Sequence, residues 1–208
     1  MGIQTEDTKK STHQYCFKGG ERGFQKRTKE VLDTLPVGFT VVSIDESFFF
    51  YDSIVRRVWI YRNNRPVIKV TGSHKHSCLF GAISLEGDQL FRQYDSFDED
   101  MFYDYLKEIH YKFPKCYLFM DKATPHYKSQ KIRSYLEKHK DVLIPVWLPT
   151  AASPEFMVLE ECWNISRNDL QLLTYYSSFK EFTKSIGEYF RTKHFNLNMR
   201  NYLLASIG

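Results

Sequence analysis

Two short, almost continuously apolar runs constrain the fold of this chain more than any other feature. They are CYLFM at residues 116–120 and VLIPVWL at residues 142–148, and a helical pattern fills residues 127–140 between them. A short run without polar alternation is typical of a strand that is buried on both faces, as in a parallel sheet. We therefore expect parallel strands joined by a helix, with Pro145 placing the second strand at an edge or a bulge.

The half of the chain before these runs has the pattern of an antiparallel meander. β-Branched and aromatic residues gather in four strand-like segments, at residues 39–50, 57–61, 76–85 and 89–94. The turn signal Glu86-Gly87-Asp88 separates the last two segments and indicates a hairpin. Helical patterns cover four further segments, at residues 24–35, 98–113, from 154 onward, and at 179–190.

These elements predict an α/β fold with one main domain. Its core is a mixed five-stranded sheet, an antiparallel meander continued by parallel strands, and helices flank it. We expect residues 1–36 to form an N-terminal arm with one short helix, and residues 37–208 to form the domain itself.

The charge of the chain is mildly basic and unevenly distributed. There are 29 Lys and Arg residues against 25 Asp and Glu residues, for a net charge of +4. Residues 56–75 hold six basic residues and no acid, and residues 122–140 hold six against one. Such one-sided segments can neutralise the phosphates of a nucleic acid, although solvated basic faces give the same pattern.

Composition and patterning exclude several classes of protein. No apolar run reaches the ~20 residues that span a bilayer, and the N-terminus lacks the apolar stretch of a secretory signal. The four cysteines are scattered, without the close pairs of a zinc ribbon or a disulfide framework. We expect an intracellular protein with reduced thiols and no membrane partner, cytoplasmic near the nucleoid in a prokaryote and nuclear in a eukaryote.

Two acidic positions stand out because of their place on the expected strands. Asp45 lies inside the run VVSIDESFFF, where a buried carboxylate is costly unless it is paired or bound to a metal. Its neighbour Glu46 points to the opposite face, and periodicity alone does not choose between them. Asp121 directly follows CYLFM, at the carboxyl end of a strand, where ligand sites gather in parallel sheets, although an Asp there can also be a helix cap.

A third acidic position lies on the helix expected after the second apolar run. Phe156, Leu159 and Trp163 recur there at i, i+3 and i+7 and define the buried stripe. At 100° per residue, Glu160 lies about 70° from the centre of that stripe and Glu161 about 170° from it. We therefore expect Glu160 to reach toward the sheet and Glu161 to face solvent.

Three carboxylates placed in this way can converge on one point. Like charges held close together repel one another, so such a cluster is stable mainly when it binds divalent cations. Oxygen ligands favour Mg²⁺ or Mn²⁺. A pair of these ions about 4 Å apart suits in-line displacement at phosphorus, and the basic segments indicate that the phosphate belongs to a nucleic acid.

Four blocks of the sequence resemble the catalytic domain of DDE transposases. They are VVSIDESFF, RPVIKVTGSHKHSCLFGAIS, YLFMDKATPHYKS and LPTAASPEFMVLEECW, and they lie in this order between residues 36 and 190. The blocks are most similar to the mariner superfamily, in its insertion-sequence-630-like branch. This resemblance implies a ribonuclease H-like fold with the first aspartate on the central strand.

The same resemblance implies a site and a reaction. It assigns the metal triad to Asp45, Asp121 and Glu160, and so favours Asp45 over Glu46. It implies that the triad binds two Mg²⁺ or Mn²⁺ ions. The chain is then expected to be a DDE transposase, a metal-dependent endonuclease and strand transferase that cuts transposon ends and joins them to target DNA.

Basic residues that follow the second aspartate are candidate contacts to DNA phosphates. They are Lys122, His126, Lys128, Lys131 and Arg133. A solvated helix face, or a helix cap in the case of the histidine, explains the same residues without a ligand.

The resemblance also implies partners. We expect the chain to bind the terminal inverted repeats of a transposon and the target DNA, and to act as a homodimer. In the family a helix-turn-helix region precedes the catalytic domain. We expect residues 1–36 to hold no complete region of this kind, which leaves room for a separate DNA-binding partner chain. The alternatives are another ribonuclease H-like nuclease, or a domesticated remnant that binds DNA without catalysis.

Overall fold

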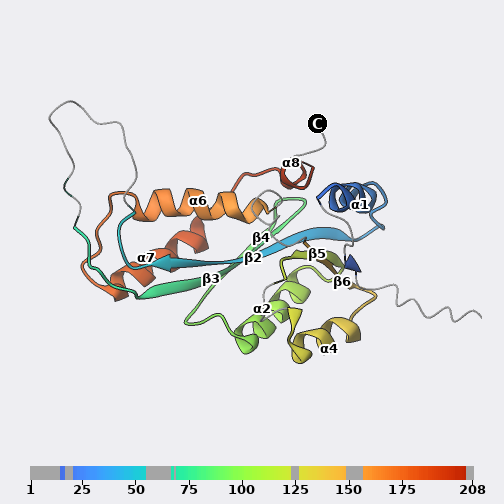
Figure 1. Ribbon diagram of the computed structural model, residues 1–208, viewed down its shortest axis with the longest axis horizontal. Coiled ribbons are helices and arrows are strands. Elements are labelled where there is room, and N and C mark those ends of the chain that lie inside the picture. Colours follow the sequence, from blue (N-terminus) through green and yellow to red (C-terminus); the bar gives the residue numbers. More distant parts are fainter. Residues whose placement is uncertain are drawn as a thin grey trace, which may run out of the picture.

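The strands form one mixed sheet in the order β1-β6-β5-β2-β3-β4 (Figure 1). The computed structural model describes residues 15–16, 21–54, 67, 69–122, 127–148 and 157–204. Within these ranges the strands are β1 (Tyr15–Cys16), β2 (Thr40–Phe50), β3 (His76–Ser84), β4 (Gln89–Tyr94), β5 (Cys116–Met120) and β6 (Leu143–Trp147). β2, β3 and β4 are antiparallel neighbours, whereas β5 and β6 run parallel to β2.

The expected mixed sheet is confirmed, with an antiparallel meander of β2, β3 and β4 continued by the parallel strands β5 and β6. The β3–β4 hairpin turns at Gly87, whose φ of +94° suits a residue without a side chain. The two-residue strand β1, inside the segment expected to be an arm, adds a sixth strand parallel to β6. The strand expected at residues 57–61 lies outside the described residues.

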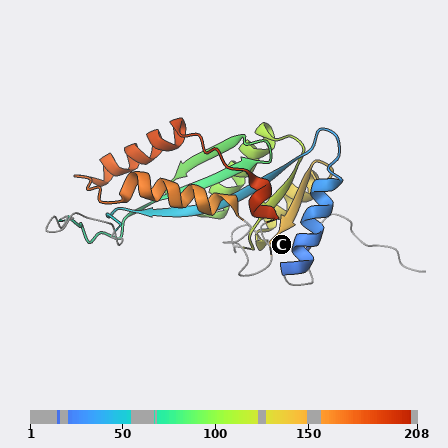
Figure 2. The ribbon, with the colours of Figure 1, turned by 90° about the horizontal axis from the view of Figure 1, so that it is seen from above.

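Helices cover both faces of the sheet. They are α1 (Glu21–Asp33), α2 (Glu99–Lys112), α4 (Gln130–Lys138), α6 (Val158–Gln171), α7 (Phe179–Thr192) and α8 (Met199–Leu203). α2 and α4 lie on one face and α6 and α7 on the other, with α1 and α8 on the side of α6 (Figures 1 and 2). None of the helices in the described part of the chain is long and apolar enough to cross a membrane.

Local signals in the sequence set the helix starts. The Asp98 carboxylate caps α2 by accepting from the Met101 amide at 2.9 Å, and Glu99 and Asp100 follow in the first turn. Ser129 caps α4 by accepting from the Ile132 amide at 3.0 Å, so this helix begins at Gln130 rather than at residue 127. The expected start of α6 at residue 154 lies outside the described residues, and the helix is described from Val158.

Pro145, which the sequence predicts to lie at an edge or a bulge, lies in the middle of β6. It lies opposite Leu118 of β5, in the ladder between β5 and β6. On the other side of β6, β1 pairs only with Val146 and Trp147. Among the described residues, none pairs with Pro145 on this side of β6, and strand edges are where proline is tolerated.

Candidate active site

The carboxyl end of β5 lies beside the middle of β2, and the sequence places one aspartate on each side of this point. The parallel ladder pairs Thr40 with Cys116 and continues to Ser43 opposite Phe119. β5 ends one residue later, whereas β2 runs on to Phe50. Asp45 follows Ser43, the last paired residue of β2, by two positions, and Asp121 follows its partner Phe119 by two positions, just past the end of β5.

Asp45 points to the face of the sheet that α6 covers. Its Oδ2 atom accepts a hydrogen bond from Nε1 of Trp163 at 2.8 Å. The indole can lie this close because Gly81 is the neighbour of Asp45 on β3. A Cβ atom on Gly81 would lie only 2.7 Å from Cη2 of Trp163 and 2.7 Å from Cε1 of Phe91. The absence of a side chain at this position therefore makes room for the donor that holds the carboxylate.

The surroundings of Asp45 disfavour its negative charge. Burial raises the pKa of the Asp45 carboxyl to about 8; the hydrogen bond from Trp163 opposes this shift, and the negative charges of Glu46 and Glu160 add to it. Asp45 and Glu160 thus lie close enough to repel each other. A half-buried carboxylate with acidic neighbours is an electrostatic environment that suits a divalent cation.

Glu160 reaches this site because the start of α6 is anchored to β2. The Ser43 hydroxyl donates to the sulfur of Met157, the residue before the helix, at 3.3 Å. Val158 and Leu159 are buried, and Glu160 is half-buried at their border. One turn of helix therefore separates the anchor from the carboxylate.

The expectation that Glu161 faces solvent is wrong. Its side chain is half-buried, and its charge adds to the effect of burial in raising the pKa of Tyr202 in α8. The short helix α8 covers a side of α6 that a helical projection of α6 alone leaves open.

The structure brings two of the expected metal ligands, Asp45 and Glu160, close enough to interact electrostatically. Across the described ranges, no three His, Cys, Asp or Glu side chains lie close enough together to hold a metal ion. Asp45 and Glu160 interact electrostatically, and the half-buried Asp121 follows the neighbouring strand end. Carboxylate oxygens are the donors that Mg²⁺ and Mn²⁺ prefer, so the chemistry of this set fits either ion.

The candidate DNA contacts differ in their surroundings. Lys122 is half-buried next to Asp121, and Lys128 is exposed. Lys131 forms an ion pair with Asp100 of α2. Arg133 donates to the Tyr127 carbonyl oxygen at 2.8 Å. His126, the remaining candidate, lies outside the described residues.

Two residues of α6 contact β2 near the candidate site and were not predicted from the sequence to belong to it. Trp163 binds Asp45, and Arg167 donates from Nη2 to the hydroxyl of Ser47. Both lie on the face of α6 that carries Glu160, at i+3 and i+7 from it. That spacing is the signal that could have identified them.

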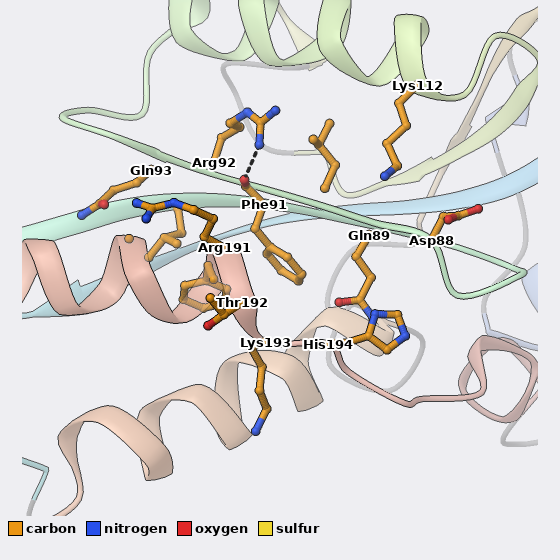
Figure 3. Close-up of a pocket in the computed structure, with 14 residues that line it drawn as sticks. Asp88, Gln89, Phe91, Arg92, Gln93, Lys112, Arg191, Thr192, Lys193 and His194 are labelled. Atoms are coloured by element: carbon orange, nitrogen blue, oxygen red, sulfur yellow. Dashed lines mark hydrogen bonds between the residues drawn. The ribbon is translucent and has the colours of Figure 1, made fainter.

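A larger hollow lies at the far edge of the sheet, between β4 and α7 (Figure 3). It has a volume of about 680 Å³, and Lys112, Arg191 and His194 are among the residues that line it. Lys112 and Arg191 belong to the last turns of α2 and α7, where basic side chains complement the helix dipole. Their positions thus have a structural explanation, and β3 separates this hollow from the carboxylates of β2.

Comparisons with solved structures agree with the fold described above, whereas no curated protein sequence matches the chain. Among solved structures, the Mos1 transposase paired-end complex with the left transposon end matches with a TM-score of 0.60 at 18% identity, over 99% of this chain and 67% of that one. The mariner Mos1 paired-end complex with Mg has a TM-score of 0.60 at 18% identity, over 99% of this chain and 65% of that one.

The Mos1 strand transfer complex matches with a TM-score of 0.56 at 16% identity, over 98% of this chain and 61% of that one. At these identities the likeness shows the fold, which is ribonuclease H-like. The chain spans about two thirds of the length of these proteins, between 61% and 67%. The profile of the family described as DDE superfamily endonuclease matches residues 40–183, more than half of the chain. The chain therefore belongs to the DDE superfamily endonucleases.

Proposed function

We propose that this chain is the catalytic part of a transposase of the mariner superfamily, in its insertion-sequence-630-like branch. It would cut DNA at the ends of a transposon and join the freed ends to target DNA. The family and the fold support an endonuclease, and the likeness to a strand transfer complex supports the joining step. The observation that carries the proposal is the half-buried Asp45 carboxylate beside Glu160, in the middle of β2, the strand that pairs with the one preceding Asp121.

Three carboxylates would form the metal site. Asp45 and Asp121 would hold two Mg²⁺ or Mn²⁺ ions, and Glu160 would complete the site of one of them. When bound, the two ions would activate the attacking oxygen and stabilise the leaving oxygen at phosphorus. Mos1 complexes with Mn and with Mg are among the similar structures, which supports divalent metal use.

The residues around the carboxylates would act by positioning. Trp163 fixes one oxygen of Asp45, because its Nε1 hydrogen bond leaves that carboxylate little freedom to rotate. The contact between Ser43 and Met157 fixes the first turn of α6 and thereby Glu160. Preorganised groups of this kind lower a barrier without reorganising during the reaction, so no covalent bond between DNA and protein is required.

DNA is the proposed substrate and partner. The basic residues after Asp121 supply positive charge next to the acidic site, with Lys122 and Lys128 available for phosphates and Lys131 already paired with Asp100. Pairing of two transposon ends would require a homodimer. Recognition of the terminal repeats would use a further DNA-binding segment or a separate partner chain.

Cleavage of DNA that carries the terminal inverted repeats tests this proposal. We expect Mg²⁺-dependent cutting by the wild-type chain and its loss in Asp45→Asn and in Asp121→Asn, because each substitution removes a negative ligand. Glu161→Gln serves as the matched control on α6 and should cut like the wild type. Undiminished cutting by either Asp variant would refute the assignment of the site.

A further inference from the structure

The outer edge of strand β4 presents main-chain groups that face away from the sheet. β4 is the last strand in the sheet, and no described residue pairs with its outer side. The Ser84 amide donates to the Asp88 carbonyl oxygen at 2.8 Å, so these residues form a hydrogen-bonded pair beside the β3–β4 turn. Such pairs alternate with non-hydrogen-bonded pairs along an antiparallel ladder. The main-chain N–H and C=O groups of Gln89, Phe91 and Gln93 therefore point outward, as a template for a further strand.

The side chain of Arg92 contacts this edge without closing it. Its Nη1 atom donates to the Phe91 carbonyl oxygen at 3.0 Å (Figure 3), and its Nε atom donates to Glu108 of α2 at 2.6 Å. A carbonyl oxygen has two lone pairs, so that of Phe91 can accept a second hydrogen bond. Arg92 is itself exposed. The edge is therefore accessible to an incoming strand.

Two hollows flank this edge, one on each side of β4. The hollow toward α7 has a volume of about 680 Å³, and the hollow toward α2 one of about 670 Å³. The side chains of Phe91 and Gln93 contact α7, whereas that of Arg92, between them, contacts α2. Successive side chains of any strand point to opposite faces of its sheet. A strand paired with β4 would therefore place alternate side chains in the two hollows.

The hollow toward α7 is basic. Lys112, Arg191 and His194 line it and are exposed, and Figure 3 shows Lys112 extending from α2 toward β4. Among the described residues that line it, Asp88 is the only acidic one. Acidic side chains of an added strand fit this side, because they would meet an excess of positive charge.

The hollow toward α2 has no such excess. Its charges form two ion pairs, Arg92 with Glu108 and Lys107 with Asp104, each at 2.6 Å. Tyr111, 91% exposed, adds an aromatic surface beside these pairs. Apolar side chains of an added strand fit this side, because they cover the tyrosine ring and bring no charge to the paired groups.

We propose that the edge of β4 binds an extended segment of a partner protein in which acidic and apolar residues alternate. Main-chain hydrogen bonds to Gln89, Phe91 and Gln93 add the segment to the sheet as a further strand. Its acidic side chains lie toward α7, and its apolar side chains lie toward α2. This interaction goes beyond the proposed reaction and does not depend on it.

The charges disfavour two other occupants of this edge. Pairing of β4 with β4 of a second copy would bring the two basic hollows together, where Lys112 and Arg191 repel their counterparts. Duplex DNA offers no row of peptide N–H and C=O groups to pair with the strand. Its phosphates would also meet the carboxylates of Asp104 and Glu108.

A short fluorescent peptide in which glutamate and valine alternate tests the site by fluorescence anisotropy. The wild-type chain should bind it. The double variant Lys112→Glu/Arg191→Glu should bind it about tenfold more weakly, because two attractive charge pairs become repulsive. Lys115→Glu/Lys180→Glu makes the same change of charge at exposed positions outside the hollow and should bind the peptide like the wild type.

Hydrogen exchange measured by NMR tests the pairing of the main chains. With the peptide at about ten times its Kd, the amides of Phe91 and Gln93 should exchange about tenfold more slowly, because binding blocks their opening to solvent. The Arg92 amide points toward β3 and should change much less. A peptide of the same sequence with N-methylated main-chain amides keeps the charges but should neither bind tightly nor protect these amides.

Four results would overturn the inference. The first is no binding of the alternating peptide by the wild type, and the second is equal binding by the wild type and by Lys112→Glu/Arg191→Glu. The third is binding without slower exchange at Phe91 and Gln93. The fourth is protection of these amides without peptide, either by self-association of the chain or by duplex DNA, which would assign the edge to a second copy or to nucleic acid.

Discussion

The two faces of strand β2 differ in their side chains: one is apolar, and the other carries polar groups that contact α6. On the side of α2 and α4, Val42 and Ile44 pack into an apolar cluster that includes Phe102. On the side of α6, three polar side chains lie between Val41 and Phe49. Each of them contacts α6 or the residue that precedes this helix. Their contacts pair Ser43 with Met157, Asp45 with Trp163, and Ser47 with Arg167.

The difference shows how one strand combines stability with chemistry. The α2 face gains stability from apolar burial, which grows with the area removed from water. The α6 face gains less stability from apolar burial, because its side chains here are polar. It instead fixes the position of a carboxylate whose charge is disfavoured by its surroundings. We expect substitutions on the first face to change stability alone, and substitutions on the second to change stability and metal binding together.

Removal of a large side chain from the α2 face should have the largest effect on stability. Phe102 belongs to α2 and is fully buried in the cluster between this helix and the sheet. Phe102→Ala should lower the free energy of unfolding by about 3–5 kcal/mol, because it removes apolar contacts and leaves a cavity. Urea unfolding measures this loss, and Phe102→Leu should recover most of it. If Phe102→Ala remained folded but lost Mn²⁺ binding, the two faces would not be independent.

The pH dependence of stability should show the second largest effect, and it arises on the α6 face of β2. The folded-state pKa of Asp45 is raised from 3.8 to about 8, so the folded metal-free protein binds a proton that the unfolded chain releases in this interval. Its stability should therefore fall as the pH rises from about 4 to about 8. Asp45→Asn removes this dependence and should raise the melting temperature at pH 8 more than at pH 5. An equal difference at both pH values would contradict the inferred environment of Asp45.

A methyl group added under Trp163 should have a smaller effect on stability. Gly81→Ala places a Cβ atom 2.7 Å from the indole and should cost about 1–3 kcal/mol of unfolding free energy through overpacking. It should also weaken Mn²⁺ binding, because Trp163 must move away from Asp45. Gly23→Ala in α1, with nothing within 4 Å of the new atom, is the matched control and should not destabilise the protein. Normal metal binding by Gly81→Ala would show that the indole does not hold Asp45.

Much of the fold follows from local patterns in the sequence. The apolar runs at β5 and β6, the hairpin at Gly87 and the Asp98 cap of α2 are each specified within a few residues. The short elements β1 and α8 were not predicted, because two and five residues are too few to show a period. They are stabilised by contacts with distant parts of the chain.

The candidate site could be predicted only in part. Both faces of β2 are buried around Asp45, so periodicity could not choose between Asp45 and Glu46, and the choice rested on family resemblance. In the structure it is Asp45 that meets Trp163 of α6, 118 positions away. The burial of Glu161 could not be predicted, because it depends on α8, which follows much later in the sequence.

Titration calorimetry with Mn²⁺ tests the central claim most directly, since the claim is that carboxylates from β2, β5 and α6 bind metal together. The wild-type chain should bind Mn²⁺, Glu160→Ala should bind it much more weakly, and Glu161→Ala, one residue away on the same helix, should bind it like the wild type. No heat of binding with the wild type, or the same binding curve for Glu160→Ala, would contradict the account.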